Sequence, residues 1–279
     1  MEQQRTEMRS ITAEQQKRVE EVCFRSLALI GRNCEYLEQH FDRTGADESA
    51  RQAVADINTA ALQLDRTLSE AITLLEFLHE DTKPQLYPID LCELLQQVAA
   101  QSDMIRAQLG VDIRLDYGGC TACCVMADRR DVELLCLHLL SNALRASREG
   151  GSVDIALRRT QTAWLLTFTD DGCGLPGEDA QAALENRRSF LGGAQLGLLL
   201  CRECCRRMGW SLQLEPAREK GTQAVVSIPL YTGESRPDGT VELRTDSETE
   251  REQRKYHLRA MLVREMRTMP ERGDPEEEF

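Results

Sequence analysis

Two stretches in the first third of the chain carry apolar residues at alternating intervals of four and three positions. The first stretch contains Cys23, Leu27, Ile30, Cys34, Leu37 and Phe41. The second contains Ile57, Ala61, Leu64, Leu68, Ala71, Leu75 and Leu78. This spacing places each set along one side of an α-helix. A polar segment around Gly45 separates the stretches, so the pattern predicts two helices that pack antiparallel in a hairpin.

Both predicted helices carry further apolar residues beside the heptad stripe, among them Val22, Phe24, Ala60 and Ile72. A lone hairpin cannot bury all of this surface. We therefore expect a second copy of the chain to complete a four-helix bundle, which makes the protein a homodimer. The alternative is a two-helix appendage folded back on the rest of the chain. Residues 1–82 are assigned to this helical, dimerising part.

Residues 83–231 predict a separate α/β domain, so the fold class of the whole chain is α+β. Helices are expected at about 89–109, 131–147 and 196–208, and strands at about 111–115, 123–126, 152–159, 163–169, 212–215 and 223–230. Paired strands with helices between the pairs indicate one mixed sheet under one helical layer. The lack of strict strand–helix alternation counts against a Rossmann fold. Residues 232–279 are expected to form an acidic, solvated tail with a short helix near 251–266.

Charge and hydropathy exclude several classes of function. The net charge of -13 argues against a nucleic-acid partner, because phosphate contacts need a surplus of Lys and Arg. No apolar run approaches the roughly 20 residues that span a bilayer. The first ten residues also lack the apolar core of a signal peptide. We therefore expect a cytoplasmic protein with no membrane insertion.

The chain has 11 cysteines, which we expect to be reduced in the cytosol. Two clusters stand out, one made by Cys120, Cys123 and Cys124 and the other by Cys201, Cys204 and Cys205. Each contains the C-x-x-C spacing found in zinc sites, so a four-thiolate site across the clusters is one interpretation. The favoured interpretation is that these thiols are small buried hydrophobic groups.

A polar face on the predicted helix 131–147 is the first candidate for chemistry. His138 and Asn142 are four residues apart and project from one face, and Arg145 lies close to the same face. An amide oxygen can complete the coordination shell of Mg²⁺, and a nearby cation attracts phosphate oxygens. The helix therefore suits a metal–phosphate ligand.

Three glycine-containing segments follow at the ends of other predicted elements. Asp170, Gly172 and Gly174 come directly after a strand, where the glycines allow a tight turn and the carboxylate can accept a hydrogen bond from an amine. Gly193 and Gly197 precede and open a helix, whose free N–H groups suit phosphate. Gly221-Thr222 leads into the last strand.

The order and spacing of these motifs resemble the ATP-binding domain shared by histidine kinases, gyrase, heat-shock chaperones and mismatch-repair ATPases. The preceding hairpin favours histidine kinases. The resemblance implies a Bergerat-type α/β sandwich that binds ATP with Mg²⁺. It implies that Asn142 holds the metal and is catalytic, that His138 is a catalytic helper which orients water or phosphate, and that Asp170 binds adenine. The remaining nucleotide-binding positions would be Arg145, which replaces the usual lysine, with Gly172, Gly174, Gly193, Gly197 and Thr222.

The chain departs from the family at the phosphate-accepting histidine. Histidine kinases carry it on the first helix of the bundle, but residues 1–39 contain no histidine. His40 falls at the end of the first predicted helix without an adjacent acid. His79 has the usual spacing to Pro84 but lies at the end of the second helix, and we interpret it as a chance match. A further glycine of the second glycine motif is replaced by Gln195.

Three functions remain open. The first is a two-component-type kinase that phosphorylates a protein. The second is a degenerate kinase whose dimer responds to nucleotide and docks a response regulator or a partner kinase, and the missing histidine favours it. The third, a serine kinase that binds a sigma factor, ranks last because it has no need of the long hairpin.

Overall fold

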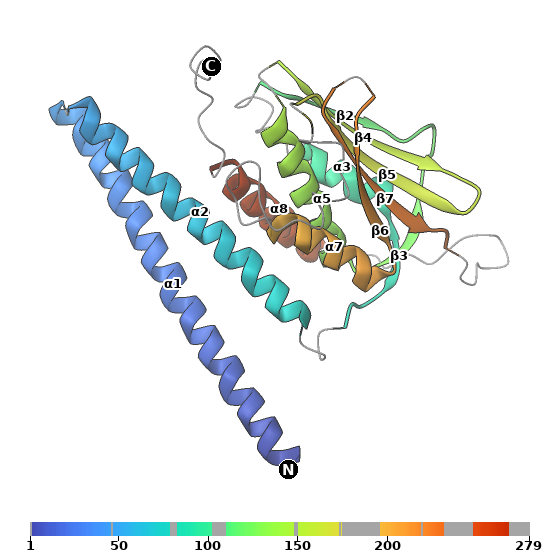
Figure 1. Cartoon of the computed structure of the whole chain (residues 1–279), viewed down its shortest axis with the longest axis horizontal. Coiled ribbons are helices and arrows are strands. Elements are labelled where there is room, and N and C mark those ends of the chain that lie inside the picture. The colour runs from blue at the N-terminus through green and yellow to red at the C-terminus, as the bar shows by residue number, and fades with distance from the viewer. Residues whose placement is uncertain are drawn as a thin grey trace. The chain divides into compact units, whose positions relative to one another are not determined.

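The computed structural model describes residues 2–45, 47–78, 83–101, 110–147, 150–172, 174, 196–218, 220–231 and 248–267 (Figure 1). The described residues divide into two compact units, one that ends at Ser69 and one that begins at Glu70. The boundary falls inside the second helix, whereas the sequence placed it near residue 82. The last turns of that helix therefore belong to the same unit as the sheet.

The first unit is a helical hairpin, as predicted. Helix α1 (Glu2–Thr44) and helix α2 (Glu48–Leu78) meet at Gly45, which adopts a φ of 72° that favours glycine. The Arg51 guanidinium closes the turn by donating 2.8 Å to the Asp42 carboxylate and 2.9 Å to the Phe41 carbonyl. Small buried side chains, Cys34 on α1 with Val54 and Ala61 on α2, contribute to the core of the hairpin.

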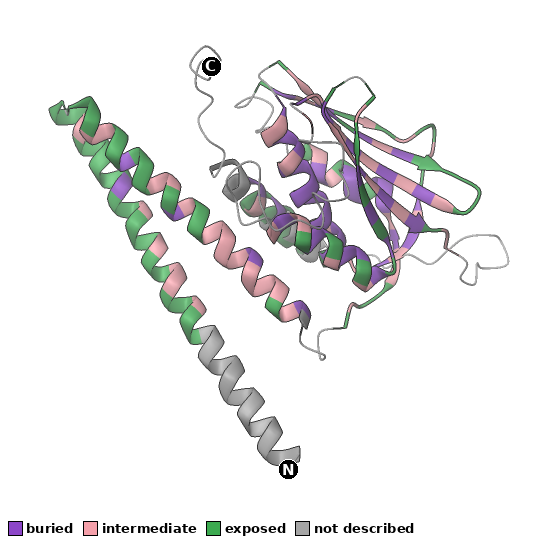
Figure 2. Ribbon diagram, in the orientation of Figure 1, coloured by how far each residue is buried: buried purple, intermediate pink, exposed green. Residues whose placement is uncertain are grey.

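Much of the predicted apolar stripe remains exposed in this single chain, where the hairpin is largely green and pink (Figure 2). Ile30 and Leu37 on α1 are 38% and 37% exposed. Ile57 and Leu64 on α2 are 53% and 60% exposed. The hairpin alone therefore does not bury its heptad residues.

The second unit is built on a five-stranded mixed sheet, which confirms the predicted architecture. Its strand order is β2-β4-β5-β7-β6, with β2 parallel to β4 and the other pairs antiparallel. The bounds are β2 Asp112–Asp116, β4 Ser152–Arg159, β5 Ala163–Asp170, β6 Ser211–Pro216 and β7 Thr222–Pro229. Side chains of β5 alternate between buried and half-buried, as expected of a strand that presents one face to a core.

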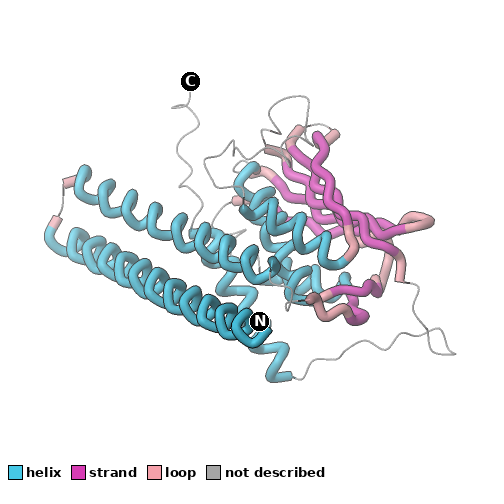
Figure 3. The backbone as a smooth tube through the Cα atoms, turned by 60° about the horizontal axis from the view of Figure 1, so that its bottom comes forward, coloured by secondary structure: helices cyan, strands magenta, loops and turns pink. Residues whose placement is uncertain are grey.

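Helices cover one face of this sheet (Figures 1 and 3). They include α3 (Leu91–Gln101), α5 (Arg129–Ala146) and α7 (Leu196–Met208). Helix α5 is the most deeply embedded, with twelve buried residues among its eighteen. It packs against both α7 and β5, so the position of its side chains is fixed by the core.

The prediction of one continuous helix from Ile89 is wrong at its start. Tyr87–Asp90 form a strand, β1, which pairs antiparallel with β3 (Cys124–Ala127), and α3 begins only at Leu91. The Asp90 side chain accepts hydrogen bonds from the backbone N–H groups of Cys92 at 3.0 Å and Cys123 at 2.9 Å. Asp90 therefore caps the helix and ties its first turn to β3. The predicted residues 102–109 of this helix lie outside the described residues.

The segment expected to be a solvated tail contains a helix that packs on the second unit. Helix α8 spans Glu248–Arg267 and lies against α3 and α5. Leu258 and Leu262, one helical turn apart, are 5% and 2% exposed and join the main hydrophobic core. The prediction of a short helix was therefore correct, but the prediction that it is solvated was wrong. Among the described helices, none is both long enough and apolar enough to cross a bilayer.

The packing of α8 predicts a stability effect in the second unit. Leu262→Ala should lower its free energy of unfolding by about 2–5 kcal/mol, because the substitution leaves a cavity beside α3 and α5. Urea unfolding followed by tryptophan fluorescence measures this, since both tryptophans, Trp164 and Trp210, are buried in this unit. Tyr256→Ala is the control, because Tyr256 is 78% exposed on the same helix. Equal midpoints for the two variants would contradict the packing of α8.

Candidate functional site

The site is centred on Asp170, the last residue of β5. Its carboxyl is buried, and its Oδ1 atom accepts hydrogen bonds from the N–H groups of Gly172 at 3.0 Å and Thr222 at 3.1 Å. Burial raises the pKa of this carboxyl, although the two hydrogen bonds act in the opposite direction. Both hydrogen bonds go to the same oxygen, so the carboxyl is held in one orientation.

Two glycines allow the backbone to approach closely around this carboxyl. A Cβ atom at Gly172 would lie 2.1 Å from the carbonyl oxygen of Ala146, at the end of α5. A Cβ atom at Gly221, whose φ is 95°, would lie 2.0 Å from the carbonyl oxygen of Asp170. Gly174 has a φ of 79° and also faces Gly221. The end of β5, the start of β7 and the end of α5 can therefore converge only where side chains are absent.

Helix α5 brings the predicted polar residues to the same region. Its N-terminus is capped by Asp128, whose side chain accepts from the Arg130 N–H at 3.0 Å. Near its C-terminal end, Asn142 is half-buried, and Arg145 is half-buried with its Nε atom 3.4 Å from the Ser141 hydroxyl. Because Gly172 packs against Ala146, one turn beyond Asn142, the end of α5 is next to the turn that holds Asp170.

The other predicted positions are only partly described. Gly197 is buried in the first turn of α7, and Thr222 begins β7 with its N–H bonded to Asp170. Gly193 and Gln195 lie outside the described residues. The structure thus brings Asp170, Gly172, Gly174 and Thr222 together.

His138 differs from its expected surroundings because it is buried, with 2% of its surface exposed. Its Nδ1 atom lies 3.6 Å from a carboxyl oxygen of Glu70, on the last turns of α2, and Glu70 is also buried. No motif in the sequence marks Glu70, which stands between Ser69 and Ala71 in the heptad pattern. A buried acid facing the candidate helix is the residue that sequence reasoning missed.

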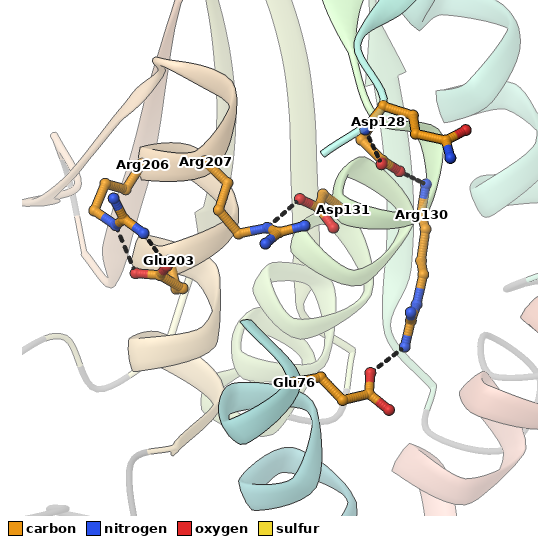
Figure 4. A network of polar contacts seen from close by, with 8 residues as sticks. Glu76, Asp128, Arg130, Asp131, Glu203, Arg206 and Arg207 are labelled. Carbon is orange, nitrogen blue, oxygen red and sulfur yellow. Dashed lines mark hydrogen bonds and ion pairs between the residues drawn. The ribbon is translucent and has the colours of Figure 1, made fainter. Parts of the chain in front are cut away.

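Several polar contacts lie where α2, α5 and α7 meet (Figure 4). Glu76 on α2 pairs with Arg130 on α5 at 2.9 Å. Arg207 on α7 donates from Nε to the Asp131 carboxylate of α5 at 2.8 Å, and both side chains are almost fully buried. The same guanidinium lies 4.1 Å from the centre of the Phe77 ring on α2. The buried Arg207 guanidinium thus contacts both α5 and α2, whereas the Glu76–Arg130 pair is exposed to solvent and contributes little.

The cysteine clusters are part of the protein core. Cys123 is buried beside β1, and Cys201, Cys204 and Cys205 are buried on α7. Burial raises the pKa of Cys205 to about 12, which keeps that thiol protonated. Within the described ranges, no group of three or more His, Cys, Asp or Glu residues is arranged to hold a metal ion. The described thiols on α7 pack as small hydrophobic groups.

Known proteins resemble this chain in sequence and in fold. Residues 127–232 match the family of histidine kinase-, DNA gyrase B- and HSP90-like ATPases. The alginate biosynthesis sensor protein KinB of Pseudomonas aeruginosa is 28% identical over 197 residues, which cover 67% of this chain and 33% of KinB. The chain spans about a third of the length of the curated relatives it matches.

Two solved structures resemble the fold over most of the chain. Full-length ShkA in complex with AMPPNP has a TM-score of 0.59 at 19% identity, covering 79% of this chain and 46% of ShkA. Histidine kinase ThkA in complex with response regulator protein TrrA has a TM-score of 0.56 at 21% identity, covering 82% of this chain and 65% of the other. Residues 127–232, within the second unit, thus match the ATPase family that histidine kinases share with gyrase and HSP90. Over a longer stretch the chain is similar in sequence to histidine kinases.

The close approach at Gly221 predicts a stability difference between two glycine substitutions. Gly119 has a similar φ of 81°, but a Cβ atom there would meet nothing within 4 Å. Gly119→Ala should therefore cost only the backbone strain of about 1–2 kcal/mol. Gly221→Ala adds the collision with Asp170 and should cost more than about 3 kcal/mol in the free energy of unfolding. Equal losses in urea titrations would show that the backbone at Gly221 is not constrained.

The burial of Asp170 predicts a pH-dependent stability. Because the pKa of Asp170 is raised above 3.8 in the folded state, the folded protein loses stability as pH rises from that value through the raised pKa. Asp170→Asn keeps an oxygen that can accept both hydrogen bonds but cannot ionise. The variant should therefore be more stable than the wild type at pH 7, and the difference should close as pH falls to about 4.

The control for this measurement is Asp154→Asn on β4, whose side chain is 51% exposed. This change should alter the free energy of unfolding by less than about 1 kcal/mol at either pH. If the stability difference between Asp170→Asn and the wild type grew as pH fell, the predicted sign of the pH dependence would be wrong.

Proposed function

We propose that the convergence of β5, β7 and α5 is a binding site for ATP with Mg²⁺, and that the chain is a histidine-kinase-type signalling protein. The observation that supports this most is the orientation of Asp170 by the Gly172 and Thr222 amides. A carboxyl group held in one orientation beside a glycine-lined turn suits the exocyclic amine and flat face of adenine. The match to the ATPase family and the AMPPNP complex of ShkA support the same nucleotide.

The residues present fit the rest of the nucleotide. Asn142 would hold Mg²⁺ through its amide oxygen and would be catalytic by doing so, and Arg145 offers a positive charge to phosphate. Gly197 in the first turn of α7, and Gly193 three residues before that helix in the sequence, would leave backbone N–H groups for the phosphate chain. Bound Mg-ATP supplies the γ-phosphoryl group and the charge neutralisation that its transfer requires. The chain's own contribution is to position the nucleotide.

We propose phosphoryl transfer to a protein as the reaction, with His138 orienting water or phosphate once it is accessible. The acceptor is not assigned, because residues 1–39 lack histidine. His40, on the last turns of α1, is exposed and stacked against Tyr36, with ring centres 6.3 Å apart. The second candidate function is a degenerate kinase that docks a partner in response to nucleotide, and the missing histidine favours it.

The hairpin supports a homodimer as the working form. Its exposed heptad residues, including Ile57 and Leu64, form the kind of surface that a second hairpin covers in a four-helix bundle. The complex of ThkA with TrrA suggests a response regulator as the partner class, with a partner kinase as the alternative.

Asp170→Asn provides the test of nucleotide binding. If the Asn oxygen accepts from Gly172 and Thr222, its NH₂ group takes the place of Oδ2 and meets the adenine amine donor to donor. Mg-ATP affinity should fall about 10- to 100-fold while the fold is retained, which calorimetric titration measures. Unchanged affinity in the variant, or no binding by the wild type, would exclude this site.

Incubation with Mg²⁺ and γ-labelled ATP separates the two candidate functions. Acid-labile, alkali-stable label on the wild type, absent from Asp170→Asn, indicates a histidine kinase. Nucleotide binding without label, including in the presence of a response regulator, indicates the docking module.

A further inference from the structure

Glu70 is a buried acidic residue. Burying a carboxylate costs free energy unless a partner stabilises its charge. Its side chain is 7% exposed, that of His138 is 3% exposed, and the two approach to 3.6 Å. A carboxylate and an imidazole buried together stabilise each other when the imidazole carries a proton. Burial chiefly, and then neighbouring charges that include Glu70, raise the pKa of Cys201 on α7. Glu70 therefore lies close to both α5 and α7.

The position of His138 on α5 connects this acid to the proposed nucleotide site. His138 precedes Asn142 by four residues, so the two side chains leave the same face of the helix one turn apart. Along this face exposure rises from the fully buried His138 to the half-buried Asn142. Glu70 on α2 therefore lies against this face of α5 one turn before the proposed metal ligand.

A contact with α7 helps to keep Glu70 at this place. Phe77 packs beneath the Arg207 guanidinium, whereas the Glu76–Arg130 pair nearby is exposed to solvent and contributes little (Figure 4 shows the charged residues). Glu70, Leu74 and Phe77 follow one another at intervals of four and three residues, so they lie along one face of α2. Leu74 and Phe77 pack against the hydrophobic core. The carboxyl group is thus held by a packed helix.

We infer that Glu70 is a specificity-determining residue, which disfavours a nucleoside triphosphate relative to a diphosphate while α2 is in contact with α5. This inference rests on the proposed nucleotide site. A triphosphate brings additional negative charge toward the Asn142 end of the site, where the Glu70 carboxylate competes with it for His138. Like charges opposed in a poorly hydrated place repel strongly. The adenine end, at Asp170, is unaffected.

Triphosphate binding and the release of α2 from α5 are then thermodynamically coupled. If contact between Glu70 and His138 weakens triphosphate binding, then bound triphosphate must weaken that contact by the same factor. The last turns of α2 should then open when the triphosphate analogue binds, and remain closed with a diphosphate. The second unit would distinguish the two nucleotides through a residue of the hairpin helix.

Calorimetric titration of the full chain tests the inference with Mg-AMPPNP and Mg-ADP. Glu70→Gln keeps the shape of the side chain and removes its charge. We expect the variant to bind Mg-AMPPNP at least about fivefold more tightly than the wild type, with less than about a twofold change for Mg-ADP. Glu76→Gln is the matched control, because it removes a carboxylate from the same helix at a pair that is 63% and 41% exposed. The control should change neither affinity by more than about twofold.

Amide hydrogen exchange of the wild type gives a second measurement that needs no variant. Peptides covering residues 70–78 should exchange faster after saturation with Mg-AMPPNP and not after saturation with Mg-ADP. Unchanged exchange with the triphosphate analogue overturns the inference, as does equal affinity of wild type and Glu70→Gln for it. If either contradicting result is found while the nucleotides still bind, the proposed nucleotide site is retained. If neither the wild type nor the variant binds either nucleotide, the inference and the proposed function are both overturned.

Discussion

The site depends on two places where backbone touches backbone with no side chain between. Gly172 lies against the last turn of α5, and Gly221 lies against Asp170. These contacts let the end of β5, the start of β7 and the end of α5 converge, and the amides of Gly172 and Thr222 then hold the Asp170 carboxyl. Beneath them β5 contributes Leu166 and Phe168 to the core, both almost fully buried. The adenine end of the proposed site is therefore formed before any ligand arrives.

Most of the second unit could be predicted because its elements have strong local periodicity. The alternating pattern of β5 and the apolar run of α5 specify their structure without help from distant contacts. The short strand β1 was missed because Ile89 lies three residues before Cys92 and so also fits the helical period of the segment that follows. Only the capping role of Asp90 separates strand from helix. The burial of Leu258 and Leu262 follows from tertiary contact alone, since the rest of α8 is strongly polar.

The candidate site was predictable to a similar extent and for similar reasons. Asp170, Gly172 and Thr222 stand at strand ends, and strand ends that pair in one sheet meet at one edge. The surroundings of His138 could not be predicted in this way. They depend on where the last turns of α2 pack, and Glu70 is separated from His138 by 68 residues without a motif that links them. The burial of Glu70 beside His138 depends on how the whole core assembles.

A preformed adenine end has a consequence for control of the site. Backbone amides hold the adenine end of the site in one arrangement. We therefore expect control of nucleotide binding to act through an element that can adopt two arrangements. Helix α2 is one continuous helix from Glu48 to Leu78, and its two parts belong to different compact units. Because the helix is continuous through Glu70, a rotation or shift of its first part would also move Glu70. If Glu70 opposes the triphosphate as inferred, a movement of the hairpin would change triphosphate affinity by moving one buried carboxyl.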